Sequence, residues 1–309
     1  MSRPSPTVSI GMPVYNGERF LRQSIDSILT QTYTDFELTI SDNASTDATE
    51  KICKDYVSRD PRIRYHRNDR NLGAAKNFNL VFGQSLGRYF RWCSADDLFA
   101  PDSLKRCVEV LDGHPEVVLC YPKTILIDEE TKVIAPYEDS LDLRFPSASK
   151  RVRAILERTR MVNVFFGLVR AEVFGKTRLM RNYKGSDVPL LIEIALHGQF
   201  WEISDPLFYR RMHAGASSTF RKESVQQWQY FMDPSTTGKL FLPCWRPYYD
   251  SFIAVLRSPL MAGQQMRLTY IIIRSAISRR QELLAELRET LRYLFLRPTQ
   301  SIAHWMSHK

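Results

Sequence analysis

The chain has 309 residues, 44% of them hydrophobic, which suffices to fill the core of one large domain or of a domain with an appendage. Its five cysteines form no CxxC pair and its histidines no cluster at zinc spacing, which predicts reduced thiols in a cytosolic protein. The first six residues lack signal-peptide features, and no apolar run approaches the roughly 18 residues that span a bilayer. We therefore expect neither export nor an integral membrane protein.

The formal net charge of +9 is concentrated near the C-terminus, where residues 251–309 carry nine Lys or Arg against three Glu. A basic balance indicates nucleic acid, anionic lipid or an anionic substrate as partner. Because the surplus is crowded into one helical tail, we favour anionic lipid and expect no nucleic-acid partner.

Strands and helices are predicted to alternate through the first hundred residues. Short β-rich segments predict strands at Thr7–Met12, Phe36–Ser41, Ile63–His66 and Tyr89–Cys93. Helical spacing predicts a helix with Leu21, Ile25, Ile28 and Leu29 on one face. A second helix is expected to be capped by Ser45 and to end near Ser58, and a third to run from Asn71-Leu72-Gly73 to about Leu86. This order predicts βαβ units, hence an α/β fold with a Rossmann-like, mostly parallel central sheet and helices on both faces.

Polar clusters follow three of these strands, at Pro13–Asn16, Asp42–Asp47 and Ser94–Asp97. Ligands of parallel sheets bind outside the carboxyl ends of the strands, so we expect the clusters to converge. Two adjacent carboxylates at a buried strand end favour a hard divalent cation that shares its other positions with phosphates. Most Asp-Asp pairs are solvated or cap helices, so this pair alone is weak evidence. Neither a GxGxxG turn nor a GxxxxGK[ST] loop is present.

Four ordered segments carry a resemblance to a known family: Pro13-Val14-Tyr15-Asn16, Ser41-Asp42-Asn43-Ala44-Ser45-Thr46-Asp47, Asn71-Leu72-Gly73-Ala74-Ala75-Lys76-Asn77 and Ser94-Ala95-Asp96-Asp97. In this order and spacing the chain resembles family 2 glycosyltransferases of the GT-A fold. The resemblance implies a nucleotide-sugar donor, usually a UDP-sugar, a Mg2+ or Mn2+ ion, and inversion at the anomeric carbon.

The resemblance assigns donor-binding roles to the first three segments. Pro13 and Tyr15 would lie against the nucleotide base, and Asp42 would accept a hydrogen bond from uracil. Turn packing and a loop cap are the structural alternatives for Tyr15 and Asp42. Lys76 stands where the family has a cation facing the diphosphate, and a solvated helix lysine is its alternative.

The resemblance assigns the metal to the acid pair. Asp96 matches the acid that touches the ribose or the metal, and Asp97 the acid that ligates the metal. Ser94 stands where many relatives have a further acid. In Tyr209-Arg210-Arg211-Met212-His213-Ala214-Gly215-Ala216-Ser217-Ser218, which resembles a Y-R-x-H-x-x-x-x-S segment, His213 would ligate the metal or contact the diphosphate, although lone histidines are usually structural.

The second half is predicted to build the acceptor side. We expect a helix to about Leu111, a strand at Val117–Tyr121, an irregular loop at Thr124–Pro146 facing the acceptor, and short strands at Gln199–Ile203 and Pro206–Arg211. Asn163–Arg170 resembles the strand that forms the floor of the acceptor site in the family. The resemblance makes Asp187 the base that deprotonates the acceptor hydroxyl. Ser186 replaces the Glu of the family's Glu-Asp pair, and Asp187 as a helix cap is the alternative.

The βα pattern stops near 220–233, which predicts a catalytic domain at residues 1–233 and a basic, amphipathic helical extension at 234–309 after the linker Pro234–Gly238. Met266–Leu296 mixes apolar residues with Arg, including Arg292. Such a segment can lie in an anionic membrane interface, or it can form a helical hairpin on the catalytic domain or on a second copy of the chain in a homo-oligomer.

The predicted function is transfer of a sugar from a nucleotide-diphosphate donor to a hydroxyl of a saccharide or lipid-linked saccharide acceptor, in cell-surface polysaccharide or glycolipid synthesis. The predicted location is the cytoplasm, with peripheral binding to the cytoplasmic face of the membrane as a variant. A catalytically weak nucleotide-sugar-binding protein and a sugar nucleotidyltransferase are the alternatives. The sugar, the acceptor and the linkage depend on loops at Thr124–Pro146 and Ser217–Tyr230, for which the sequence offers no rule.

Overall fold

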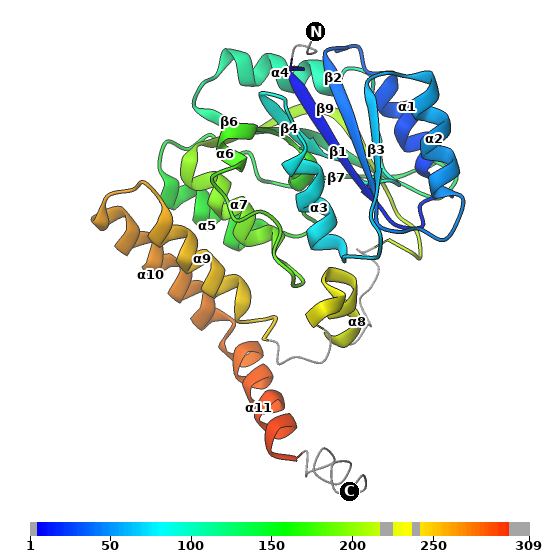
Figure 1. Ribbon diagram of the computed structural model, residues 1–309. Coiled ribbons are helices and arrows are strands. Elements are labelled where there is room, and N and C mark those ends of the chain that lie inside the picture. Colours follow the sequence, from blue (N-terminus) through cyan, green and yellow to red (C-terminus); the bar gives the residue numbers. More distant parts are fainter. Residues whose placement is uncertain (1–4, 217–224, 237–241, 297–309) are drawn as a thin grey trace, which may run out of the picture.

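A single mixed sheet organises the protein. The computed structural model describes residues 5–216, 225–236 and 242–296 (Figure 1). Eight strands follow the order β3-β2-β1-β4-β8-β6-β9-β5, and β7 pairs with β6 at the side. The strands are β1 Val8–Val14, β2 Phe36–Asp42, β3 Ile63–Arg67, β4 Tyr89–Trp92, β5 Leu98–Phe99, β6 Val117–Ile127, β7 Val133–Tyr137, β8 Leu168–Arg170 and β9 Gln199–Arg211.

Helices cover both faces of this sheet. One core cluster joins the strands to α1, α2 and α4, and the other joins them to α3, α5, α6 and α7. These helices are α1 Leu21–Leu29, α2 Thr49–Arg59, α3 Ala74–Gly83, α4 Ser103–Gly113, α5 Ala148–Arg158, α6 Ala171–Phe174 and α7 Asp187–His197. The predicted α/β fold with helices on both faces is confirmed.

The first four strands run parallel, and their register places the polar clusters side by side. Val14 at the end of β1 pairs with Asp42 at the end of β2, and Asp42 pairs with Arg67 at the end of β3. Every residue of β2 is buried, as expected for a strand covered on both faces. The loops that follow β1, β2 and β3 therefore leave the sheet at one edge.

The strands of the second half make the sheet mixed and correct three sequence predictions. β6 continues from Val117 to Ile127 and pairs antiparallel with β7, so much of Thr124–Pro146 is a hairpin and not an irregular loop. β9 is one strand with register shifts against β6, not two short strands. Asn163–Phe166 forms a 3-10 turn, and only Leu168–Arg170 (β8) is a strand.

The C-terminal part comprises α8 Val225–Met232, a 3-10 turn at Pro234–Thr236, α9 Arg246–Arg257, α10 Ala262–Ser278 and α11 Arg280–Leu296. α8 packs on α3, whereas α9 and α10 form a layer against α5 and α7. α9 packs on α7, and α10 packs on α5 and α9, whereas α11 projects away from the body (Figure 1). Across the described parts of the chain, no helix combines the length and the apolarity that crossing a membrane requires.

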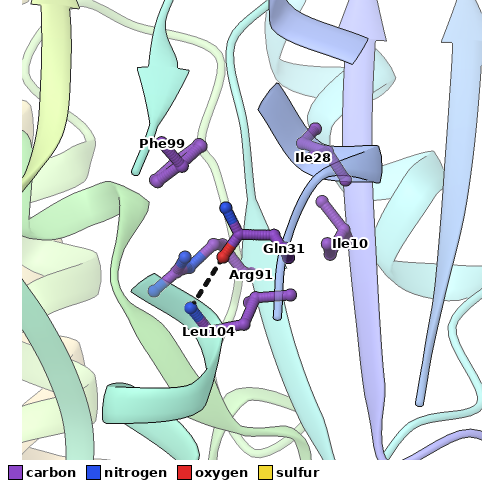
Figure 2. A pocket seen from close by; sticks show the side chains of 6 residues that line it. All are labelled: Ile10, Ile28, Gln31, Arg91, Phe99 and Leu104. Atoms are coloured by element: carbon purple, nitrogen blue, oxygen red, sulfur yellow. Dashed lines mark hydrogen bonds between the residues drawn. The ribbon is translucent and has the colours of Figure 1, made fainter. Parts of the chain in front are cut away.

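A narrow internal space lies between α1, β4 and α4. Figure 2 shows Arg91 among Ile10, Ile28 and Phe99, beside the hydrogen bond of 2.9 Å from the Leu104 N–H to Gln31 Oε1. The space admits no water molecule. It is therefore a packing gap in the core and not a substrate pocket.

Candidate active site

The loops after β1 and β2 are locked together by hydrogen bonds. The Asn16 N–H donates to Ser45 Oγ at 2.9 Å, and Asn16 Oδ1 accepts the Thr46 N–H at 2.8 Å. The Gly17 N–H donates to Thr49 Oγ1 at 2.9 Å. Asn16 has a φ of 51°, a left-handed conformation that asparagine tolerates better than most residues. Two of the predicted polar clusters thus form one rigid surface.

The contacts of Ser45 correct its predicted role. α2 begins at Thr49 after Ala48, so Ser45 does not cap this helix. Its Oγ instead accepts the Asn16 N–H from the loop after β1. Sequence proximity to a helix suggested capping, but a partner from another loop takes the oxygen.

Tyr15 is exposed at this surface. It follows β1 directly and half of its side chain is solvent-accessible (50%). Pro13 belongs to β1, where it pairs with Ser41. A Cβ atom placed on Gly17 would lie 3.5 Å from the Ala95 side chain, so the loop also borders the turn that carries the acid pair. The Tyr15 ring is therefore available to a flat ligand at the edge of the sheet.

Asp42 is fully buried at the end of β2. Its Oδ1 accepts the Ser45 N–H at 2.8 Å, and its Oδ2 accepts the Tyr65 hydroxyl at 2.8 Å and Arg67 Nη1 at 3.0 Å. Burial and the bond to Asp42 raise the pKa of Tyr65. Two carboxylate oxygens offer about four acceptor sites, so the three bonds leave capacity for a further donor.

Buried amides hold the start of α3 against the end of β2. Asn77 Nδ2 donates to the Ser41 carbonyl at 2.9 Å, and Asn77 Oδ1 accepts the Ser41 hydroxyl at 2.6 Å. Asn68 bridges Asn77 and Asn43 with bonds of 3.0 and 3.1 Å. A buried amide left unpaired is costly, so this network fixes the backbone that carries Lys76.

Lys76 is paired with an acid from the C-terminal part of the chain. Its Nζ lies 3.0 Å from Asp233 Oδ1, while half of the Lys76 side chain stays exposed. Burial opposes ionisation of Asp233, but hydrogen bonds from Ser235 and Lys76 keep its pKa below the usual value. Gly73, with a φ of +85°, lets this segment approach, since a Cβ there would lie 2.5 Å from the Met232 carbonyl oxygen.

Asp97 is the more buried member of the acid pair. Its Oδ1 accepts the Arg211 N–H at 2.8 Å, and the Ser24 hydroxyl donates to its carbonyl at 2.7 Å. Burial, reinforced by the charge of Asp96, raises the pKa of Asp97 to about 8. An acid in this state gains from a nearby cation, which would favour its ionised form.

Asp96 is bound to the predicted histidine. His213 Nε2 lies 2.7 Å from Asp96 Oδ2, and the Ser94 hydroxyl donates to Asp96 Oδ1. Burial opposes ionisation of Asp96, but the bonds from His213 and Ser94 keep its pKa below the usual value. Asp96 and His213 are thus in direct contact, and Asp97 follows Asp96 in the chain, while Ser217 and Ser218 of the same segment lie outside the described residues.

Arg211 ties this centre to two other segments, which the sequence did not reveal. Its side chain is buried (1% exposed), and Nε donates to the Asp96 carbonyl at 2.9 Å. Nη2 reaches Gln23 on α1 at 2.7 Å, and Nη1 reaches the carbonyl oxygens of Asp128 and Glu129 at 3.0 Å each. No single-sequence signal distinguishes this arginine from its neighbour.

Asp187, the predicted base, lies at the start of α7. It is the first residue of α7, and its Oδ1 accepts the Val188 N–H at 3.0 Å. Burial raises the pKa of Asp187. The positive charge of Arg210 offsets part of the rise in the pKa of both Asp187 and Asp97.

Asn163 links Arg210 to the buried acid Asp139. Arg210 Nη1 donates to Asn163 Oδ1, and Asn163 Nδ2 donates to Asp139 Oδ2 at 3.2 Å. Asp139 Oδ2 also accepts the Thr124 hydroxyl at 3.2 Å, while Asp139 Oδ1 is buried without a partner. Burial raises the pKa of Asp139 to about 7. Sequence analysis missed Asp139 because it placed this residue in an irregular loop.

The donor set suits a divalent ion only if a ligand completes it. Within the described ranges, no three His, Cys, Asp or Glu side chains are grouped so as to hold a metal by themselves. The two carboxylates and the imidazole of Asp96, Asp97 and His213 are chemically suited to Mg2+ or Mn2+. Such ions usually fill their remaining positions with water and substrate phosphates, which fits a site that the protein alone leaves incomplete.

Comparisons with known proteins agree with this arrangement. An uncharacterized glycosyltransferase of Methanocaldococcus jannaschii is 31% identical over 135 residues, which are 43% of this chain and 47% of that relative. An uncharacterized glycosyltransferase of Rickettsia typhi is 35% identical over 119 residues, 38% of this chain and 36% of the relative. The matched region thus spans less than half of the length of these relatives.

Solved structures share the fold. S. aureus TarS 1-349 in complex with UDP-GlcNAc superposes with a TM-score of 0.67 at 15% identity, covering 93% of this chain and 81% of that TarS fragment. The mannosyltransferase PcManGT from Pyrobaculum calidifontis, in complex with GDP-Man and Mn2+, gives a TM-score of 0.56 at 14% identity, covering 98% and 79%. The model of glycosyl transferase family 2 matches residues 9–177, which include β1 to α6 and the acid pair. The chain belongs to glycosyl transferase family 2.

Proposed function

We propose that the protein transfers a sugar, with inversion, from a UDP-sugar to a hydroxyl of a saccharide or lipid-linked saccharide, with Mg2+ or Mn2+ at Asp96 and Asp97. One observation carries the proposal: at the end of β9 the Arg211 N–H binds Asp97 at 2.8 Å and His213 Nε2 lies 2.7 Å from Asp96, in a chain whose residues 9–177 match glycosyl transferase family 2. An acid pair beside an imidazole supplies ligands for a divalent ion that shares its other positions with a diphosphate.

The proposed donor site lies on the interlocked loops after β1 and β2. The exposed Tyr15 ring offers a stacking face for uracil beside Pro13. Asp42, held by Tyr65 and Arg67, would accept the uracil imide N–H with its remaining capacity. The hydrogen bonds between the loops hold this surface ready before the donor binds, which reduces the cost of ordering it.

The proposed diphosphate site lies between the acid pair and α3. Asp96, Asp97 and His213 would hold the ion, which supplies positive charge to the departing diphosphate. Lys76 would add a second positive charge once the diphosphate competes with Asp233 for its ammonium group. This chain's residues would thereby fix the orientation of the bond that breaks.

Asp187 is the proposed base. Asp187 Oδ1 accepts the Val188 N–H, and Asp187 Oδ2 is hydrogen-bonded to no described residue. Oδ2 would accept the proton of the acceptor hydroxyl while that oxygen bonds to the anomeric carbon. The bond from the anomeric carbon to the diphosphate breaks in the same step, and its electron pair leaves with UDP. A raised pKa makes the carboxylate a stronger base at neutral pH.

Exchange of Asp187 for asparagine tests the proposal. Asp187→Asn should lower UDP release from the donor in the presence of acceptor by about 10²-fold or more. UDP should still protect the variant against thermal unfolding when Mn2+ is present. The control Asp112→Asn, at an exposed position on α4, should keep full activity. Unchanged turnover of the Asp187 variant would remove this residue from the reaction.

The same assays separate the alternatives. A sugar nucleotidyltransferase would release pyrophosphate from UTP and a sugar phosphate, not UDP. A nucleotide-sugar-binding protein without turnover would show UDP protection in the wild type, but no UDP release with any donor and acceptor. Lack of UDP protection with either metal would contradict the proposed donor site itself.

A further inference from the structure

The outer sides of α9 and α10 carry a surface that the sugar-transfer site does not explain. We call it the outer face and define it by Tyr249, Phe252, Leu256, Tyr270, Ile273 and Ile277. These side chains are between 36% and 62% exposed. Within each helix they recur every three or four residues, so they form one row along each helix.

The outer face is not needed for packing against the rest of the protein. α9 already buries Ala254 and Val255 toward the body, and α10 buries Leu268, Ile271 and Ile272. Both helices sit on the α5 and α7 layer (Figure 1). A surface helix normally turns polar residues to solvent, whereas α9 and α10 are apolar on two opposite sides. Exposed apolar rows of this kind mark an interaction surface.

The exposed charges within residues 246–279 have one sign. Arg257, Arg267, Arg274 and Arg279 are all exposed. The one acid from 246 to 279 is Asp250, which is 1% exposed and bound to Arg178 and Tyr183 inside the protein. α11, by contrast, carries Glu282, Glu286 and Glu289. Exposed apolar rows and exposed arginines therefore occur together in residues 246–279, a stretch with no exposed acid.

We infer that the outer face of α9 and α10 docks on an anionic lipid bilayer. Arginines would meet the headgroups, and the aliphatic side chains would enter the boundary of the acyl region. Tyr249 and Tyr270 have the ring and hydroxyl that favour the membrane interface. Docking goes beyond the proposed sugar transfer and does not depend on it.

Two other partners fit the chemistry less well. An isologous contact with a second copy would bring arginines against arginines, with no exposed acid on the same face to balance them. Nucleic acid would match the arginines but offers no hydrocarbon for Ile273 and Ile277. A bilayer with anionic headgroups satisfies both features of the surface.

Vesicle flotation of the full chain tests the inference. The wild type should float with vesicles of phosphatidylcholine containing about 30% phosphatidylglycerol and should bind pure phosphatidylcholine vesicles much more weakly. Equal failure to float with both kinds of vesicle would overturn the proposal. UDP protection is measured separately without vesicles, so failure of docking and failure of the proposed function are distinguishable.

The apolar contribution is tested by Ile273→Glu with Ile277→Glu. We expect loss of flotation with anionic vesicles, by at least about tenfold in bound fraction, and unchanged helix content by circular dichroism. The matched control is Val133→Glu with Ile134→Glu on β7, where the side chains are 65% and 54% exposed. Flotation of both double variants at the wild-type level would overturn the role of the outer face.

The charge contribution is tested by a variant that leaves the apolar rows intact. Arg267→Gln with Arg274→Gln should weaken binding to anionic vesicles about thirtyfold, following the usual effect of two basic residues near a charged membrane. Lys51→Gln with Lys105→Gln removes the same charge from exposed positions on α2 and α4 and should have little effect. Equal losses in the two pairs would show only bulk charge attraction and refute the assignment.

Sedimentation velocity decides between lipid and a second copy. The wild type should sediment as a monomer without vesicles. A dimer that Ile273→Glu with Ile277→Glu dissociates would assign the outer face to a second copy of the chain and overturn the lipid proposal.

Discussion

Replacing Asp139 with asparagine should make the protein more stable than the wild type, and this difference should grow as the pH rises. The carboxyl is 4% exposed, and burial raises its pKa from 3.8 to about 7. A raised pKa means that the folded state holds a proton that the unfolded state has released. The associated stability is fully present below pH 3.8 and is lost as the pH rises through 7.

The size of the effect follows from the two pKa values. Between pH 5 and pH 8 the wild type should lose about 3 kcal/mol of unfolding free energy through Asp139 alone. Asparagine has nearly the same shape and no charge, and its Oδ1 can still accept from Asn163 and Thr124. The free energy of unfolding of Asp139→Asn, relative to wild type, should therefore grow by this amount over the same interval.

Urea denaturation at pH 5 and pH 8 measures this change. The comparison is made between variant and wild type at each pH, so that other groups with raised pKa, such as Asp97, cancel. Asp69→Asn, at an exposed position, should show no pH-dependent difference from wild type. A stability difference for Asp139→Asn that is equal at the two pH values would refute the reasoning, because Asp139 would then ionise as an ordinary carboxyl.

Three further results are expected. Arg211→Met should lower the free energy of unfolding by about 3–5 kcal/mol, because the carbonyl oxygens it serves stay buried. Arg210→Met should cost about 1–2 kcal/mol, since it leaves Asn163 Oδ1 without its donor, and should abolish turnover; equal urea midpoints of the two variants would contradict this. Gly73→Ala should lower the free energy of unfolding by about 1–3 kcal/mol, because its φ is +85° and a Cβ there would meet a backbone carbonyl of α8. Gly83→Ala, with open space around it, should not lower it, and thermal melts compare the two variants. Asp233→Asn should tighten UDP binding in calorimetry, because the lysine it pairs with is released to the diphosphate, and an unchanged Kd would place that lysine outside the donor site.

The donor side could be predicted from the sequence because its signals are local. A strand that is buried on both faces is a short run of β-branched and apolar residues, and its end is marked by polar residues such as those at Asp42 and Asp96. Parallel pairing then brings successive strand ends to one edge. The predicted positions of β1 to β4 agree with the structure to within two residues, and the clusters that follow β1 and β2 are hydrogen-bonded to each other.

The acceptor side was predicted less well because its contacts join distant segments. The charged residues of Thr124–Pro146 suggested a loop, but β9 provides a partner along almost the full length of β6. Asp139 looks like any surface acid in sequence, and only the approach of Asn163 and Thr124 reveals its burial. A buried polar group is recognised by its partners, and those partners lie far away in the chain.

The end of β9 shows how one strand serves both sides of the site. Successive side chains of a strand point to opposite faces, and Arg210 and Arg211 are consecutive. Arg211 holds the Asp96 carbonyl and Gln23 of α1, whereas Arg210 binds Asn163. Shifting the register by one residue would exchange the two guanidinium groups. Leu126 and Ile127 of β6 pair with Arg210 and Arg211 of β9. This register therefore sets the relative position of the acid pair and the candidate base.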